Sequence, residues 1–241
     1  MVLDVEISEL GTILGVWAHP DDEAYLMGGL MFLAARAGQR VVCVTATRGE
    51  AGSQDEERWP PSKMAEIRER ELGEALDVLE VKEHVWLDYI DGECHTVDPD
   101  EAVSRLAPIV EEVRPDAILT FGPDGQTGHL DHIAVHAWAQ EAFHTVAPKG
   151  AGLHHAITTP EWMDRFGPAL EPYNVFAPGT PLTASEDECS IYVELEGEAL
   201  DRKVQALKKQ VSQTEGLISA FGEEAYRDFL SLEAFVEAAR R

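Results

Sequence analysis

Short apolar runs alternate with longer segments of helical periodicity in the first part of the chain. Four continuous apolar runs predict buried strands at 12–18, 40–46, 84–87 and 116–121. Each is followed by a segment with apolar residues near helical spacing, which predicts helices at 24–37, 62–79, 99–113 and 129 to about 144. Strands joined by helical crossovers predict a Rossmann-like α/β fold: a mostly parallel sheet with helices on both faces.

The periodicity is lost between residues 150 and 185, where several prolines fall. We interpret this stretch as long loops with one strand at 153–157, and we expect part of the substrate specificity to reside in it. Beyond it the pattern predicts a strand at 191–195 and helices at about 198–212 and 223–240. Because there is no internal repeat and no clear linker, residues 1–241 are predicted to form one domain with its site at the carboxyl ends of the strands.

Polar residues cluster directly after the predicted strands. The first strand runs into His19-Pro20-Asp21-Asp22-Glu23, and polar residues follow the next three strands as well: Arg48 and Glu50, then Asp91, then His129, Asp131 and His132. The carboxyl ends of parallel strands share one edge of the sheet, where ligands bind. We therefore expect all four loops to converge on one site.

Crowded carboxylates next to imidazoles are typical of a divalent cation site, because a cation relieves their mutual repulsion. Two histidines and a carboxylate suit a catalytic zinc with an open position for water, and the same set matches the facial triad that holds iron(II). One alternative is that Asp21 or Asp22 only caps a helix, which leaves the histidine unexplained. Another is that His136, one helical turn beyond His132, is a ligand, although packing is the more common role of such a histidine.

The composition narrows the choice of partners. The chain has 19 basic and 45 acidic residues and a formal net charge of −26, which argues against binding to nucleic acids or acidic membranes. Its three cysteines form no CxxC pair, so a zinc ribbon or dithiol redox centre is not expected. Since the sequence shows no secretory signal and no membrane span, we expect a cytoplasmic protein that acts on a small molecule.

Three motifs resemble a known family, the LmbE-like/PIG-L N-acetylglucosaminyl deacetylases. They are AHPDDE at 18–23, TRGEAGS at 47–53 and GHLDH at 128–132. The resemblance extends to Arg68 and Glu71 in one helix and to the Asp91-Gly92 pair, and it covers nearly the whole chain in order.

The resemblance implies a role for each residue of the motifs. His19, Asp22 and His132 are expected to bind zinc, with iron(II) as the other candidate, and Asp21 is expected to be the general base. His129 is implied as the electrostatic or general-acid partner, oriented by Asp131, and the residues expected to hold the substrate are Arg48, Glu50, Arg68 and Asp91.

The function that follows from the resemblance is zinc-dependent hydrolysis of the N-acetyl group of a small N-acetylglucosamine-containing molecule. One alternative is an amidase with the same metal site that cleaves another amide, such as that of a thiol-sugar S-conjugate. A less favoured alternative is a non-enzymatic sugar- or nucleotide-binding module, which would need a closed four-ligand metal site. The resemblance also implies that copies of the chain associate.

Overall fold

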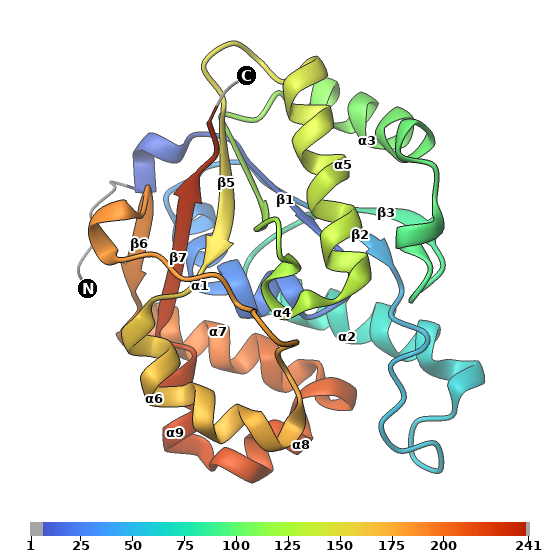
Figure 1. Cartoon of the computed structure of the whole chain (residues 1–241), viewed down its shortest axis with the longest axis vertical. Helices are drawn as coiled ribbons and strands as arrows, with labels where there is room; N and C mark the ends of the chain where they lie inside the picture. The colour runs from blue at the N-terminus through green and yellow to red at the C-terminus, as the bar shows by residue number, and fades with distance from the viewer. Residues whose placement is uncertain (1–6, 240–241) are drawn as a thin grey trace.

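Seven strands form one sheet in the computed structural model, which describes residues 7–239 (Figure 1). In order across the sheet they are β3 (Glu83–Tyr89), β2 (Val41–Thr47), β1 (Ile13–Trp17), β4 (Ala117–Phe121), β5 (Gly152–Ile157), β7 (Leu232–Glu237) and β6 (Ile191–Glu194). From β3 to β5 every neighbouring pair is parallel, whereas β7 is antiparallel to both β5 and β6. The predicted Rossmann-like, mostly parallel sheet is confirmed.

Helices cover both faces of this sheet (Figure 1). On one face α3 (Pro99–Val113) packs against α5 (Leu130–Val146), which crosses β1 and β4. On the other, α7 (Gly197–Lys209) packs between α1 (Asp22–Arg36) and α2 (Met64–Val78). The central strands are buried on both sides, which explains why β1, β2 and β4 are continuous apolar runs in the sequence. The turn α4 (Gly125–Gly128) leads from β4 toward α5.

Residues 150–185, predicted to be mostly loop, contain a helix, α6 (Pro160–Leu170). Its start carries recognisable signals: Pro160 occupies the first turn, and the side chain of Thr159 accepts a hydrogen bond from the backbone N–H of Trp162. An interior proline, Pro168, masked the helical pattern in the sequence.

The C-terminal prediction is wrong in part. The helix expected at 198–212 is divided into α7 and α8 (Val211–Phe221), which meet at Gln210. In place of one helix at 223–240, the chain forms the short helix α9 (Glu223–Phe229) and then β7, and residue 240 lies outside the described residues. The strand is favoured there because its backbone pairs on both sides, with β5 and with β6.

Candidate metal centre

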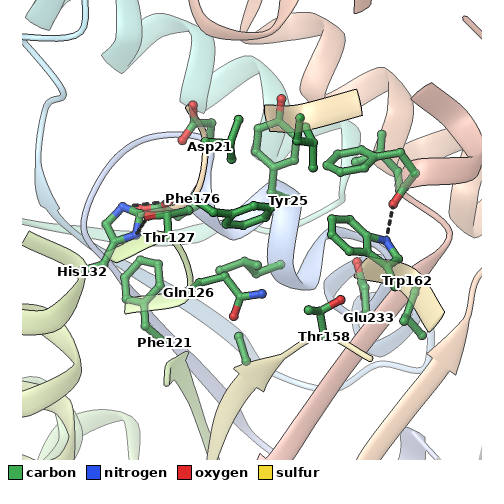
Figure 2. Close-up of a pocket in the computed structure, with 18 of the residues that line it drawn as sticks. Asp21, Tyr25, Phe121, Gln126, Thr127, His132, Thr158, Trp162, Phe176 and Glu233 are labelled. Carbon is green, nitrogen blue, oxygen red and sulfur yellow. Dashed lines mark hydrogen bonds and ion pairs between the residues drawn. The ribbon is translucent and has the colours of Figure 1, made fainter. Parts of the chain in front are cut away.

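A cavity of about 480 Å³ lies at the carboxyl edge of the parallel strands (Figure 2). Its polar end is formed by residues that follow β1 and β4: Asp21, Asp22, His129 and His132. Most of the remaining wall is apolar and comes from the second half of the chain. Open α/β sheets bind ligands at this edge, and the predicted histidine and aspartate cluster lies there.

Three donor residues face one another at the polar end. Nδ1 of His19 lies 3.1 Å from Nε2 of His132, and that atom lies 3.4 Å from Oδ1 of Asp22. Oδ2 of Asp22 lies 3.6 Å from Nδ1 of His19. Donor atoms bound tetrahedrally to zinc at about 2.1 Å are about 3.4 Å apart. The spacing is compatible with one divalent cation shared by His19, His132 and the carboxylate of Asp22. His129 also belongs to the cluster, because a ring nitrogen of each of His19, His129 and His132 lies within 4.8 Å of the other two.

The structure holds His132 so that its Nε2 points into the site. Its Nδ1 lies 2.9 Å from the carbonyl oxygen of Gly125, and its ring stacks on Phe121 with centroids 4.2 Å apart. Burial lowers the pKa of His132 to about 4, so the imidazole is neutral, as a metal ligand must be. The alternative ligand His136 lies behind Phe121, with its Nδ1 2.8 Å from the carbonyl oxygen of that residue.

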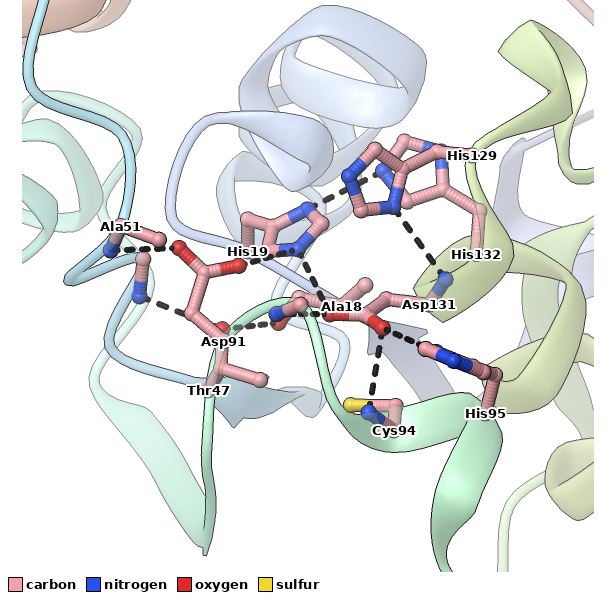
Figure 3. A network of polar contacts seen from close by, with 12 residues as sticks. Ala18, His19, Thr47, Ala51, Asp91, Cys94, His95, His129, Asp131 and His132 are labelled. Carbon is pink, nitrogen blue, oxygen red and sulfur yellow. Dashed lines mark hydrogen bonds and ion pairs between the residues drawn. The ribbon is translucent and has the colours of Figure 1, made fainter.

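His19 is held from the opposite side by two carboxylates (Figure 3). Its Nε2 lies 3.1 Å from Oδ1 of Asp91 and 3.4 Å from Oδ2 of Asp131. Burial acts to lower the pKa of His19, but the hydrogen bonds to Asp131 and Asp91 outweigh it and raise the pKa to about 10. Without a metal these carboxylates favour a protonated His19, and a bound cation would take the place of the proton on Nδ1. Carboxylate partners of this kind orient metal-bound histidines.

Asp21 lines the same cavity next to the three donors, with its Oδ2 3.3 Å from Nη2 of Arg68. Burial raises the pKa of Asp21 to about 7, against the lowering effect of the Arg68 guanidinium. Its φ of 111° is one that side-chain-bearing residues rarely adopt, and such strain is concentrated at functional sites. Asp21 is the N-cap residue of α1, yet its side chain makes no capping hydrogen bond. Helix capping therefore does not explain this carboxylate.

His129 lies at the exposed edge of the cluster, with its ring centroid 4.9 Å from that of His19. The expectation that Asp131 orients His129 needs a correction. The carboxylate of Asp131 is directed to His19 and to the backbone N–H groups of Gly92 and Cys94. Only the backbone N–H of Asp131 reaches His129, donating to Nδ1 at 3.2 Å.

The two arginines predicted to bind substrate are engaged within the protein, and neither lines the cavity. Arg48 forms ion pairs of 2.7 Å with Glu69 and with Asp88. Arg68 is buried and donates to the carbonyl oxygens of Pro20 and Gly49. Arg68 therefore ties the turn after β1 to the loop after β2, and positions Asp21.

Glu50 and Asp91, the predicted acidic substrate contacts, also lie outside the cavity lining. Oε1 of Glu50 accepts a hydrogen bond from the backbone N–H of Asp91 at 3.1 Å. The side chain of Asp91 accepts one from the backbone N–H of Ala51 at 2.9 Å, besides its contact with His19. Both carboxylates thus fasten the loops behind His19.

Gln126 and the aromatic wall of the cavity are features of the site that were not predicted from the sequence. Gln126 has a φ of 64°, and its side-chain Oε1 is buried without a hydrogen-bond partner among the described residues. The aromatic wall includes Tyr25, Trp162 and Phe176. Of these, only Trp162 and Phe176 fall in the stretch where specificity was expected, and no local pattern distinguishes them from core residues.

The chain is similar in sequence to known proteins. The sequence profile of the family described as "PIG-L: GlcNAc-PI de-N-acetylase" matches residues 14–143. A 1D-myo-inositol 2-acetamido-2-deoxy-alpha-D-glucopyranoside deacetylase from Kineococcus radiotolerans is 35% identical over 167 residues, which are 58% of this chain and 46% of that protein. The chain spans about half the length of several curated relatives that it matches.

Solved structures share the fold over most of the chain. The N,N'-diacetylchitobiose deacetylase from Pyrococcus horikoshii has a TM-score of 0.68 at 20% identity, over 98% of this chain and 87% of that one. GalB, the 4-carboxy-2-hydroxymuconate hydratase from Pseudomonas putida, has a TM-score of 0.62 at 18% identity, over 96% and 97%. Because these two enzymes are named for different reactions, the shared fold alone does not determine the chemistry.

No helix within residues 7–239 is long and apolar enough to cross a membrane.

The profile match spans more than half of the chain and includes both histidine motifs, the one that follows β1 and the one that opens α5. On this match the chain belongs to the PIG-L family, the LmbE-like proteins that include N-acetylglucosaminyl deacetylases.

Proposed function

We propose that this protein is a metal-dependent amidohydrolase that removes the N-acyl group, in the simplest case acetyl, from a small amino-sugar substrate. One observation carries the proposal: for each pair among His19, Asp22 and His132, two donor atoms lie within 3.6 Å of each other. This cluster lies at the edge of a cavity that Asp21 and His129 also line. The named activities of its relatives support the same reaction.

The metal would be held by His19, Asp22 and His132, and zinc is the preferred ion because two imidazoles and one carboxylate form a known catalytic zinc set. Iron(II) accepts the same ligands and stays the second candidate. When bound, the ion would act as a Lewis acid toward water and the amide carbonyl. A set of three protein ligands would leave a coordination position for the water and the amide carbonyl. The closed four-ligand site of a purely structural metal has no such position.

Asp21 would act as the general base. Its carboxylate lines the cavity beside the three donors, where it can accept a proton from the attacking water and release it later to the departing amine. Burial raises the pKa of Asp21 above its ordinary range, which strengthens it as a base. Arg68 holds this carboxylate in place, with its own position set by the carbonyl oxygens of Pro20 and Gly49.

His129 would stabilise the negative charge that develops on the carbonyl oxygen. Its Nδ1 accepts the backbone N–H of Asp131, so the neutral ring carries its proton on Nε2. Burial lowers the pKa of His129, which favours this neutral form. Of the two roles expected from the sequence, electrostatic partner and general acid, we therefore assign His129 the first, as a neutral hydrogen-bond donor.

The test is a panel of N-acetylglucosaminides and amide-linked thiol-sugar S-conjugates, incubated with the metal-stripped protein after addition of zinc or iron(II). We expect release of free amine together with acetate from at least one N-acetylglucosaminide, and only when metal is present. Cleavage of the S-conjugates alone would favour the other amidase. Metal binding without cleavage of any amide would contradict the proposal. Location in the cytoplasm and self-association stay predictions.

A further inference from the structure

The cavity extends away from the metal centre as an aromatic chamber. Figure 2 shows His132 and Asp21 at one end and Trp162, Thr158 and Glu233 at the other. Its lining is mostly apolar and includes the aromatic residues Tyr25, Trp162, Phe176 and Phe229 and the aliphatic residue Val175, together with the polar residues Gln126 and Thr158. Its 480 Å³ is within the size range of pockets that enclose whole ligands.

The polar tips of the chamber's aromatic residues are already engaged. The indole N–H of Trp162 donates to the carbonyl oxygen of Phe229 at 3.1 Å, and the hydroxyl of Tyr25 accepts a hydrogen bond from Tyr226 at 3.1 Å. The rings of Trp162 and Phe229 pack with centroids 5.1 Å apart. These residues therefore present ring surfaces to the chamber, and few of their hydrogen-bonding groups are left for a ligand.

The two charged residues in the wall form an ion pair with each other. Lys203 and Glu233 are fully buried, with Nζ 2.9 Å from Oε1. The two carboxylate oxygens of Glu233 also accept the backbone N–H groups of Gly29 and Leu30, at 2.8 and 2.7 Å. The positive charge of Lys203 and the negative charge of Glu233 neutralise each other. The far wall therefore favours an apolar occupant over a sugar, because the hydroxyls of a sugar would lose their hydration here.

The position of the metal centre determines which part of an amide enters the chamber. An amide carbonyl at the centre has its acyl group on one side and its amine on the other. A polar sugar on the amine side would remain near the exposed residue His129, where water reaches it. The acyl group would then point past His132 into the chamber, where burial of apolar surface is favourable.

We infer that the acyl group removed by this protein is longer than acetyl: a medium-length aliphatic or aryl-alkyl acyl chain that occupies the aromatic chamber. This inference rests on the proposed amidohydrolase function and names its substrate class. Acetyl would place a single methyl group at the entrance of the chamber and leave the rest of it unused.

The first experiment compares N-acetyl-, N-butanoyl-, N-hexanoyl- and N-octanoyl-glucosamine with the metal-loaded protein. Each methylene buried in the chamber is expected to raise kcat/KM about threefold to fourfold until the chamber is full. A flat or falling series, with N-acetylglucosamine turned over normally, would overturn the inference. A rise along N-acetylglucosaminides with lengthening alkyl aglycones, and not along the acyl series, would also overturn it, because the chamber would then take the amine side.

Two variants test whether the chamber causes the preference. Val175 lines the chamber, and V175W is expected to lower the ratio of kcat/KM for the octanoyl over the acetyl substrate at least tenfold by filling it. The matched control is L182W, because Leu182 belongs to the same region, is 45% exposed and does not line the cavity. L182W should leave the ratio unchanged. An unchanged ratio in V175W would overturn the inference.

A binding measurement separates failure of the chamber from failure of the proposed function. Octanoate, the acid that would be released, is expected to raise the Tm of the wild-type protein more than acetate does, and V175W is expected to abolish the difference. If no amide is cleaved but octanoate binds in this way, the chamber inference holds and the proposed reaction fails. If octanoate stabilises the protein no more than acetate does, the chamber inference fails, whatever the outcome with amides.

Discussion

Nδ1 of His19 lies 3.1 Å from Nε2 of His132, although the two residues are 113 positions apart in the chain. Both positions follow from the sheet: His19 follows β1 and His132 lies in the first turn of α5, after β4. β1 and β4 are parallel neighbours in register from Ile13 opposite Ala117. Their carboxyl ends therefore open side by side, and the turns that follow them share one site.

Removal of one donor should abolish tight metal binding. We expect H132A to lower the affinity for zinc by more than about a hundredfold. Loss of a residue that only hydrogen-bonds to a ligand costs up to about a hundredfold, and loss of the ligand itself should cost more. H144A, on the same helix and outside the donor clusters of the described residues, should bind zinc as the wild type does. Metal content after dialysis against a buffered zinc series measures this. Equal content in H132A and wild type would contradict the assignment.

Loss of the proposed base should reduce turnover without loss of metal. D21N keeps the size of the side chain but cannot accept a proton, so kcat should fall about a hundredfold to ten-thousandfold. D164N, at an exposed position of α6, serves as the control. Steady-state kinetics is combined with metal analysis of the same samples. Normal turnover by fully metallated D21N would refute the assignment of the base.

Arg68 should be far more important for stability than Arg70 on the same helix. The guanidinium of Arg68 is buried and holds two backbone carbonyls as well as Asp21, so R68L should lower the free energy of unfolding by about 3 kcal/mol or more. The side chain of Arg70 is 63% exposed, and R70L should cost less than about 0.5 kcal/mol. Urea unfolding of both variants measures the difference, and equal losses would contradict the role of Arg68.

Stability should fall in mild acid because of His155. Burial, helped by the neighbouring His136 and His154, lowers the pKa of His155 from 6.5 to about 4. Between these values the unfolded chain binds the proton and the folded protein does not. The contribution of His155 to the free energy of unfolding is therefore fully present above pH 6.5. It declines as the pH falls toward 4, by at most about 3 kcal/mol.

The variant H155L should show a shallower decline over the same pH range, since it has no proton to bind. H144L is the control, because His144 lies near the end of α5 and is only partly buried. Urea unfolding at a series of pH values from 7 to 4.5 gives the slopes. If H155L and wild type decline with the same slope, His155 is not a source of the acid sensitivity.

The buried pair Lys203–Glu233 should be asymmetric in its effect on stability. Glu233 binds the Lys203 ammonium and also two backbone N–H groups that follow the break in α1 at Met27. E233A should therefore lower the free energy of unfolding by about 3–5 kcal/mol. K203M should cost less, because the carboxylate keeps both backbone donors. D201A, which removes the partner of the half-exposed Arg227, should cost less than about 1 kcal/mol. A larger loss in K203M than in E233A would contradict this order.

The amino-acid sequence by itself determines the central part of the fold. β1, β2 and β4 are continuous apolar runs because both of their faces are covered, and this pattern is visible without any partner strand. The local pattern predicts a helix where β7 forms, because the strand depends on pairing with β5 and β6, which are distant in sequence. Local periodicity does not report pairing of that kind.

The same division applies to the site. The sequence pointed to His19, Asp22 and His132 because each lies at the end of a recognisable strand or the start of the next helix, where a parallel sheet must bring them to one edge. Only the tertiary structure decides that the carboxylate of Asp131 faces His19 and that Trp162 and Phe229 pack together in the wall of the aromatic chamber. Those contacts depend on side-chain packing between distant segments, which chain order and composition do not specify.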